Sequence, residues 1–209
     1  MLGGNGAGKT TTLSMLLGLL EPSSGSIRLF GQDFIQDRFS VLGRMNFSSP
    51  YVDLPQRLTV RENLLVYAKM YGVSRPRERV AEVASSFRVE ELLDRRMRKL
   101  SSGQKTRASL AKAMINEPEF LLLDEPTASL DPETTAWIRD LLGQYRKERG
   151  TTILFASHDM REVELLCDEA LLMRKGKLVV KGSPKSLLEK FERDTLEEVF
   201  LQVNQDGSP

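Results

Sequence analysis

Short apolar runs alternate with helical patterns in the second half of the chain. Three runs, at 120–123 (FLLL), 151–156 (TTILFA) and 170–173 (ALLM), have the length of single strands, and an amphipathic segment at 132–149 separates the first two. Continuous apolar strands that alternate with helices are typical of a parallel sheet covered on both faces. The pattern therefore predicts an α/β core in this half.

The middle of the chain has only helical periodicity. Thr59 with Glu62 three residues later forms a capping-box pattern that predicts a helix over 60–71, and Pro76 opens another. Nearer the start, residues 11–20 predict a leucine-rich helix, and 26–30 alternate like a short strand. We interpret 55–116 as a helical lobe inserted into the α/β core.

We interpret all 209 residues as a single domain. Its α/β core comprises 1–54 and 117–182, the helical lobe comprises 55–116, and C-terminal helices fill 183–209. The segment 176–184 is typical of a final hairpin that leads into a helix, and 195–201 predicts a closing helix.

Composition narrows the possible partners. The 30 basic residues balance 29 acidic ones, so no net field favours nucleic acid or an anionic membrane surface, and nucleic acid is not an expected partner. Cys167 is the single cysteine, which excludes an intramolecular disulfide and favours a reducing compartment. No apolar run approaches the ~20 residues of a membrane helix, and the first residues lack the regions of a signal peptide.

A phosphate-binding loop opens the chain. Residues 3–10 read GGNGAGKT, the complete G-x-x-x-x-G-K-[ST] pattern. In such loops, glycine backbone N–H groups converge on phosphates, the lysine (Lys9) neutralises the β and γ oxygens, and the hydroxyl of Thr10 ligates Mg²⁺. The following helix adds its positive N-terminal end. A chance glycine-rich turn would match in roughly one per cent of such chains or fewer, so nucleotide binding is the stronger interpretation.

Two carboxylates follow the first apolar run. Asp124 and Glu125 come where a parallel strand ends, which is where ligand crevices lie. Asp124 is placed to hold the Mg²⁺ shell, and Glu125 could polarise a water for attack on the γ-phosphate. By itself the pattern also suits a strand that ends in solvated turn residues, and the phosphate loop favours the catalytic interpretation.

The sequence LSSGQ at 100–104 opens a helix predicted over 105–116. By propensity alone, a serine N-cap on an amphipathic helix explains it. However, LSSGQ, the phosphate loop, LLLDEP, the 128–131 loop and His158 occur in an order and approximate spacing that resemble the ATP-binding subunits of ABC transporters. The resemblance covers nearly the whole chain, and it implies the P-loop NTPase fold.

The resemblance implies a role for each matching position. Glu125 would be the catalytic base, His158 the switch residue at the γ-phosphate, and Asp131 the residue that links two sites across a dimer interface. Thr10 and Asp124 would hold Mg²⁺. The residues that would bind ATP are Gly3, Gly4, Asn5, Gly6, Ala7, Gly8, Lys9, Thr10 and Thr11 in the loop and, acting on the nucleotide of a second subunit, Ser101, Ser102, Gly103 and Gln104.

The resemblance also implies partners. Two such domains would pair head to tail with ATP between them, and hydrolysis would separate them. A separate membrane-spanning permease would carry the transported substrate, so the domain would lie on the cytoplasmic face of the membrane and touch it only through that permease. Residues 195–201 (TLEEVFL) resemble the closing helix of ABC-2 type exporter ATPases, which favours export.

The sequence departs from the family pattern at two places. Where a glutamine usually senses Mg²⁺ and the permease, Ser49 or Pro50 stands instead. The family also places further strands and an adenine-stacking aromatic ahead of the phosphate loop, whereas the first two residues here are too few for a useful strand. Losing a base–aromatic stack of ~1–3 kcal/mol would weaken nucleotide binding roughly ten- to a hundredfold. We therefore expect this chain alone to be poorly soluble or to bind ATP weakly.

Two other functions fit parts of the sequence. A nucleotide-gated dimerisation module or truncated remnant would keep the motifs without hydrolysing ATP. A soluble superfamily member in DNA repair or translation would share them too, but such proteins usually carry long coiled coils or paired ATPase domains, and neither pattern occurs here.

Overall fold

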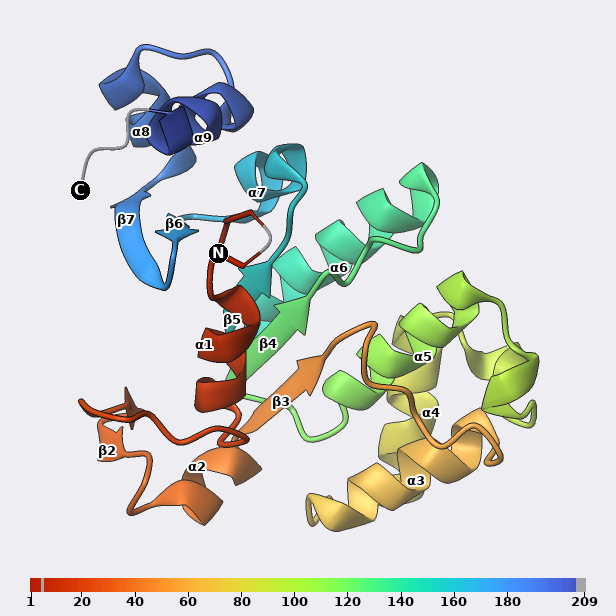
Figure 1. Cartoon of the computed structure of the whole chain (residues 1–209). Coiled ribbons are helices and arrows are strands. Elements are labelled where there is room, and N and C mark those ends of the chain that lie inside the picture. The colour runs from red at the N-terminus through yellow and green to blue at the C-terminus, as the bar shows by residue number, and fades with distance from the viewer. Residues whose placement is uncertain (5, 206–209) are drawn as a thin grey trace. The chain divides into compact units, whose positions relative to one another are not determined.

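The computed structural model describes residues 1–4 and 6–205, and Figure 1 traces the order of their elements. The chain forms two compact units. The first comprises residues 1–28 and 155–209, and the second comprises residues 29–154. We describe each unit by itself. Among the described residues, no helix combines the length and the apolar character needed to cross a bilayer.

The second unit contains the predicted apolar strands. Its three-stranded sheet has the order β3-β4-β5, with the middle strand parallel to β3 and Met45 opposite Phe120 (Figure 1). The side chains of residues 121–123 in β4 are at most 2% exposed, as expected for a strand covered on both faces. The strands are β1 (Arg28–Leu29), β2 (Gln32–Asp33), β3 (Met45–Ser48), β4 (Phe120–Asp124) and β5 (Thr152–Ala156); β1 begins in the first unit and β5 ends there.

Helices α3, α4 and α5 pack on one another within the segment 55–116 (Figure 1). Thr59 caps α3 with the predicted capping box, and Pro76 is the first residue of α4. The helices of this unit are α2 (Arg38–Gly43), α3 (Val60–Met70), α4 (Pro76–Ser86), α5 (Ser102–Ala113) and α6 (Pro132–Arg149), with 3₁₀ turns at Glu90–Leu92 and Met97–Lys99.

The first unit carries the phosphate loop and both ends of the described chain. Leu2 is fully buried and bridges in parallel to Leu172, donating to the carbonyl of Leu171 at 2.8 Å. Strands β6 and β7 form an antiparallel hairpin. The elements are α1 (Lys9–Leu16), α7 (Met160–Leu166), β6 (Ala170–Arg174), β7 (Lys177–Gly182), α8 (Pro184–Phe191) and α9 (Leu196–Gln205).

Several predicted boundaries were wrong. The first helix begins at Lys9 and ends at Leu16, because Gly18 adopts a positive φ of 68° before the predicted stop. The strand expected over 26–30 shrinks to two residues, and β6 pairs with β7 in a separate two-stranded sheet rather than with β5. Strand β3 was not predicted, because its polar residues Asn46 and Ser48 are buried and give no apolar run.

Candidate functional site

The phosphate loop leads into a helix whose first turn has no side-chain cap. Gly8 is the N-cap of α1 with φ 101°, a left-handed conformation that side chains rarely adopt. Helix α1 also has no acidic residue in its first turn. The N–H groups of that turn and the positive end of the helix dipole are therefore available to bind an anion. Thr10 and Thr11 are exposed in this turn.

Lys9 folds back over the loop that precedes it. Its ammonium group donates to the carbonyl of Gly3 and, at 3.3 Å, to that of Gly4. The loop is braced by the β6–β7 turn, where the N–H of Gly176 donates to the carbonyl of Ala7 at 2.9 Å. A Cβ on Gly3 would lie 2.8 Å from the carbonyl oxygen of Met173, so only glycine fits there. The backbone carbonyls of the loop therefore hold the Lys9 ammonium at the loop.

Of the remaining predicted loop residues, Gly6 is exposed and has a positive φ of 77°. Asn5 lies outside the described residues. His158, in the same unit, is exposed in the short connection between β5 and α7. Asp159, the next residue, caps α7 by accepting from the N–H groups of Arg161 and Glu162. The helix start therefore fixes the backbone next to His158.

The predicted carboxylates lie at the end of β4 in the second unit. The hydroxyl of Ser49 donates to Asp124 Oδ2 at 3.2 Å and accepts from the N–H of Tyr51 at 3.3 Å. Of the two residues that could replace the usual glutamine, Ser49 is thus the one bonded to the aspartate. Glu125 has a φ of 47°, a strained conformation for a non-glycine residue of the kind that is concentrated at active sites.

The LSSGQ segment forms the start of α5. Ser101 is the N-cap, and its hydroxyl accepts from the N–H of Gln104 at 3.3 Å while the Gln104 side chain accepts from the N–H of Ser101 at 3.0 Å. Ser101 and Ser102 are exposed. A Cβ on Gly103 would lie 3.3 Å from the carbonyl oxygen of Ser129, which is tight. The absence of a side chain at 103 therefore lets the helix start approach the 128–131 loop.

Asp131 is the N-cap of α6. Its carboxylate accepts from the backbone N–H of Thr134 at 2.9 Å and from the Thr134 hydroxyl at 2.6 Å. The hydroxyl bond is the main cause that lowers the pKa of Asp131. The residue predicted to link two sites thus has a structural role within its own chain.

Each unit carries oxygen donors of a kind that Mg²⁺ binds. This ion usually keeps several waters and is held by one or two carboxylates together with substrate phosphates, rather than by an all-protein cage. In the second unit, Asp124 provides one carboxylate, and Ser49 is hydrogen-bonded to it. In the first unit, Thr10 is exposed and has a hydroxyl directly after the phosphate loop. Carboxylate and hydroxyl oxygens are ligands that a hard cation prefers.

A family model described as ABC transporter matches residues 1–128, which is more than half of the chain. The chain belongs to the ABC transporter family, among its ATP-binding domains. It is 40% identical to the Nod factor export ATP-binding protein I of Burkholderia orbicola, over 90% of this chain and 62% of that protein. It is 34% identical to the ABC transporter ATP-binding protein NatA of Bacillus subtilis, over 96% of this chain and 82% of that protein.

A solved structure described as the ATP-binding subunit of an ABC transporter shares the fold of this ABC domain. The TM-score is 0.89 at 26% identity, over 98% of this chain and 87% of that one. The predicted α/β fold of the P-loop NTPase type is therefore confirmed. The chain spans about three fifths of the length of the Nod factor relative.

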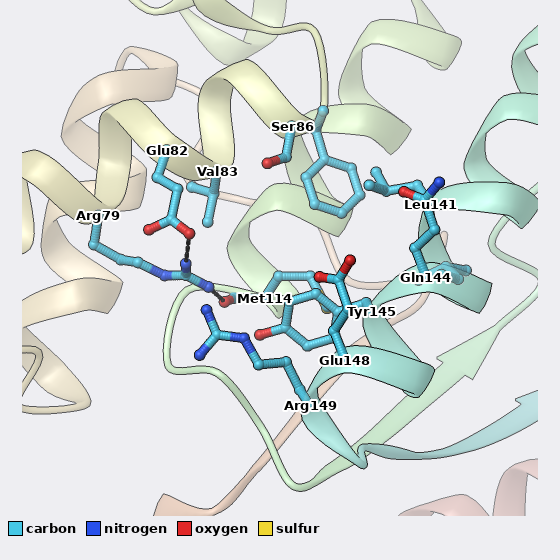
Figure 2. A pocket seen from close by; sticks show the side chains of 12 residues that line it. Arg79, Glu82, Val83, Ser86, Met114, Leu141, Gln144, Tyr145, Glu148 and Arg149 are labelled. Carbon is cyan, nitrogen blue, oxygen red and sulfur yellow. Dashed lines mark hydrogen bonds and ion pairs between the residues drawn. The ribbon is translucent and has the colours of Figure 1, made fainter.

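A separate pocket of about 240 Å³ lies in the second unit of the ABC domain, lined by residues of α4 and α6 together with Phe87 and Met114 (Figure 2). Buried Arg79 donates from α4 to the carbonyls of Met114 at 2.6 Å and Ile115 at 3.2 Å, just past the end of α5. It also forms an ion pair with Glu82 at 2.7 Å. We interpret Arg79 as a C-terminal cap of the LSSGQ helix. No sequence signal distinguished it from the other arginines of the lobe.

The same helix carries a buried lysine. Lys112 donates to the carbonyl of Phe47 at 2.7 Å and lies 4.6 Å from the centroid of the Phe47 ring. Burial lowers the pKa of Lys112 from 10.5 to about 8. This bond connects helix α5 to β3 at Phe47, which lies two residues before Ser49.

This pKa predicts a pH-dependent stability. Between pH 8 and 10.5 the folded chain binds fewer protons at Lys112 than the unfolded chain does, so the free energy of unfolding rises with pH. From pH 7 to pH 9.5 we expect the wild type to gain roughly 2 kcal/mol relative to Lys112→Met. Urea unfolding of both proteins at the two pH values measures this gain. A difference between them that stays constant with pH would refute the prediction.

Proposed function

We propose that this chain binds ATP with Mg²⁺ at residues 3–11, hydrolyses it, and powers a membrane exporter. The observation that carries the proposal is the phosphate loop: an uncapped helix start faces it, and the Lys9 ammonium is bonded back onto its carbonyls. In the proposal, the N–H groups of the helix start and the Lys9 ammonium would be the donors and the positive charge that a polyphosphate requires.

In the proposed reaction, Lys9 neutralises charge on the β- and γ-phosphates, Glu125 orients the attacking water, and His158 contacts the transferring phosphoryl group. When bound, Mg²⁺ would supply further charge neutralisation at the phosphate oxygens, held by Thr10 and Asp124. Ser49 would hold the Asp124 carboxylate in place, since its hydroxyl bonds to one of the two carboxylate oxygens.

We further propose that a second ATPase domain completes the site. The exposed Ser101 hydroxyl and the start of α5, with Gly103, would meet the γ-phosphate held by the loop of the partner. Asp131, at the start of α6, would link the two sites. Hydrolysis would then release the two domains, which is how ATP would drive the cycle.

A membrane-spanning permease is the proposed partner, with the chain on the cytoplasmic face. Relatives support export: their names include Nod factor export in Burkholderia orbicola and bacitracin transport in Bacillus licheniformis. The closing helix, α9, lies where the exporter-like TLEEVFL sequence predicts it.

Phosphate release by the wild-type chain in MgATP tests the proposal. We expect steady release that stops when EDTA removes the metal, because the phosphate charge is then no longer neutralised. Binding of ATP without any release would favour the non-hydrolysing dimerisation module instead.

Replacement of Ser49 tests its link to the metal. Ser49→Ala removes one hydrogen bond of ~1 kcal/mol from Asp124, so we expect roughly five- to tenfold slower hydrolysis and a higher Mg²⁺ requirement. Pro50→Ala is the matched control, because it changes the neighbouring candidate and keeps the hydroxyl. Equal Mg²⁺ dependence in the two variants would show that the bond has no such role.

A further inference from the structure

Helix α4 ends in a turn that carries arginine where glycine is usual. The N–H of Arg88 donates to the carbonyl of Ser85 at 3.0 Å. The next N–H, that of Val89, donates to the carbonyl of Ala84 at 2.9 Å. These two bonds define a Schellman motif, whose left-handed residue is most often glycine. Helix α3 ends in the same motif with Gly72, whereas Arg88 adopts a φ of 50°, which is strained for a residue that has a side chain.

Arg88 makes contacts with two other helices. Its guanidinium carbon lies 4.2 Å from the centroid of the Trp137 ring in α6, within the range of a cation–π interaction. Its backbone carbonyl accepts from Arg107 Nη1 in α5 at 2.7 Å. Arg88 thus bridges α5 and α6. Glycine at this position would keep the carbonyl and lose the ring contact, so the ring contact is what the strained arginine adds.

The bridge lies close to the starts of both helices. Arg107 lies in the second turn of α5, whose N-cap is Ser101. Trp137 lies in the second turn of α6, whose N-cap is Asp131. The two bridged arginines also line a pocket of about 320 Å³ together with Gln104 of the LSSGQ segment. Contacts this near to both N-caps constrain where the two helix starts lie relative to each other.

We propose that Arg88 is a positioning residue, which holds the starts of α5 and α6 in one fixed arrangement. The inference rests on the proposed dimer, in which these two helix starts meet a second copy of the chain. A surface that is ordered before association loses less conformational freedom on binding. Arg88 touches no reacting atom. It acts on the association of two copies and leaves the affinity of each phosphate loop for ATP unchanged.

Phosphate release at saturating MgATP, measured over a range of chain concentrations, tests this inference. For Arg88→Gly, we expect the chain concentration that gives a half-maximal rate per chain to rise at least about fivefold, the size of one partly exposed cation–π contact. Glycine suits the left-handed turn and keeps the carbonyl for Arg107, so this variant should fold.

Two further variants serve as controls for the same measurement. Arg88→Lys keeps a cation for the ring and should restore the wild-type value to within about twofold. Arg77→Ala removes an exposed arginine from α4 itself and should leave the half-maximal chain concentration at the wild-type value.

Two other measurements separate positioning from a general loss of structure. Trp137 is the single tryptophan of the chain, so its fluorescence reports the contact directly. In Arg88→Gly we expect its emission to shift to longer wavelength, because one face of the ring opens to water. The urea midpoint should stay near the wild-type value, because relief of the backbone strain offsets the lost contact.

The possible outcomes distinguish this inference from the proposed function. An unchanged half-maximal chain concentration in Arg88→Gly, or an unchanged emission of Trp137, would overturn the inference. A fall in the ATP affinity of the dilute chain that accounted for the slower release would do the same. Failure of the wild type to release phosphate at any chain concentration would instead overturn the proposed function itself.

Discussion

Glu125→Gln is expected to lower the rate of phosphate release at least a hundredfold while leaving ATP affinity within about twofold. The amide keeps the size and most hydrogen bonds of the carboxylate but cannot accept a proton from the attacking water. General-base catalysis of this kind contributes roughly 10²–10⁴-fold. Single-turnover phosphate release and nucleotide titration on the same preparation measure the two quantities.

Glu119→Gln is the matched control for this prediction. Glu119 directly precedes β4, at the opposite end of the strand from Glu125, and its carboxylate pairs with Arg44 at 2.6 Å. Since Arg44 and Glu119 are both exposed, breaking their pair costs little, and hydrolysis should stay near the wild-type rate. Equal hydrolysis by Glu125→Gln and wild type would remove Glu125 from the mechanism and favour the non-hydrolysing alternative.

Arg79→Met should lower the free energy of unfolding by roughly 3 kcal/mol. The side chain is buried, and its loss would leave the carbonyls of Met114 and Ile115 without their donor and Glu82 without its partner. Methionine fills a similar volume, so the loss reports on the charge and its hydrogen bonds rather than on a cavity. Urea denaturation of both proteins measures it.

Arg75→Met provides the comparison from the same lobe. Arg75 is 77% exposed and pairs with Glu78 at 3.2 Å, so its replacement should change stability by less than about 1 kcal/mol. If the two variants lost the same stability, Arg79 would not be the cap that holds the end of α5.

The elements that the sequence predicted best have local signals. Helix α6 has the predicted bounds, with Pro132 at its start and Gly150 after its end, and β4 differs by one residue from its apolar run. The capping box of α3 was read directly from Thr59 and Glu62. Strand β3 has no such signal, because the partners of Asn46 are Lys112 and Asn116, some 70 positions away.

The residues of the candidate site also differ in whether the sequence carries a local signal for them. The phosphate loop is a contiguous pattern that residue types and spacing were sufficient to find. The carboxylates after β4 became candidates only beside that loop, and the LSSGQ helix start only through the resemblance to ABC ATP-binding subunits. The sequence left two candidates, Ser49 and Pro50, for the residue that replaces the usual glutamine. Only the hydrogen bond from Ser49 to Asp124 distinguishes them.

Titration of MgATP into the wild-type chain and into Lys9→Met tests the central claim most directly. The claim is that polyphosphate binds where the Lys9 ammonium lies over the loop. A charge-assisted bond of ~1.5–3 kcal/mol corresponds to roughly ten- to a hundredfold in affinity. We predict one ATP per chain for the wild type and a loss of that size in Lys9→Met. Equal affinity in the two proteins, or no binding to the wild type, would contradict the account.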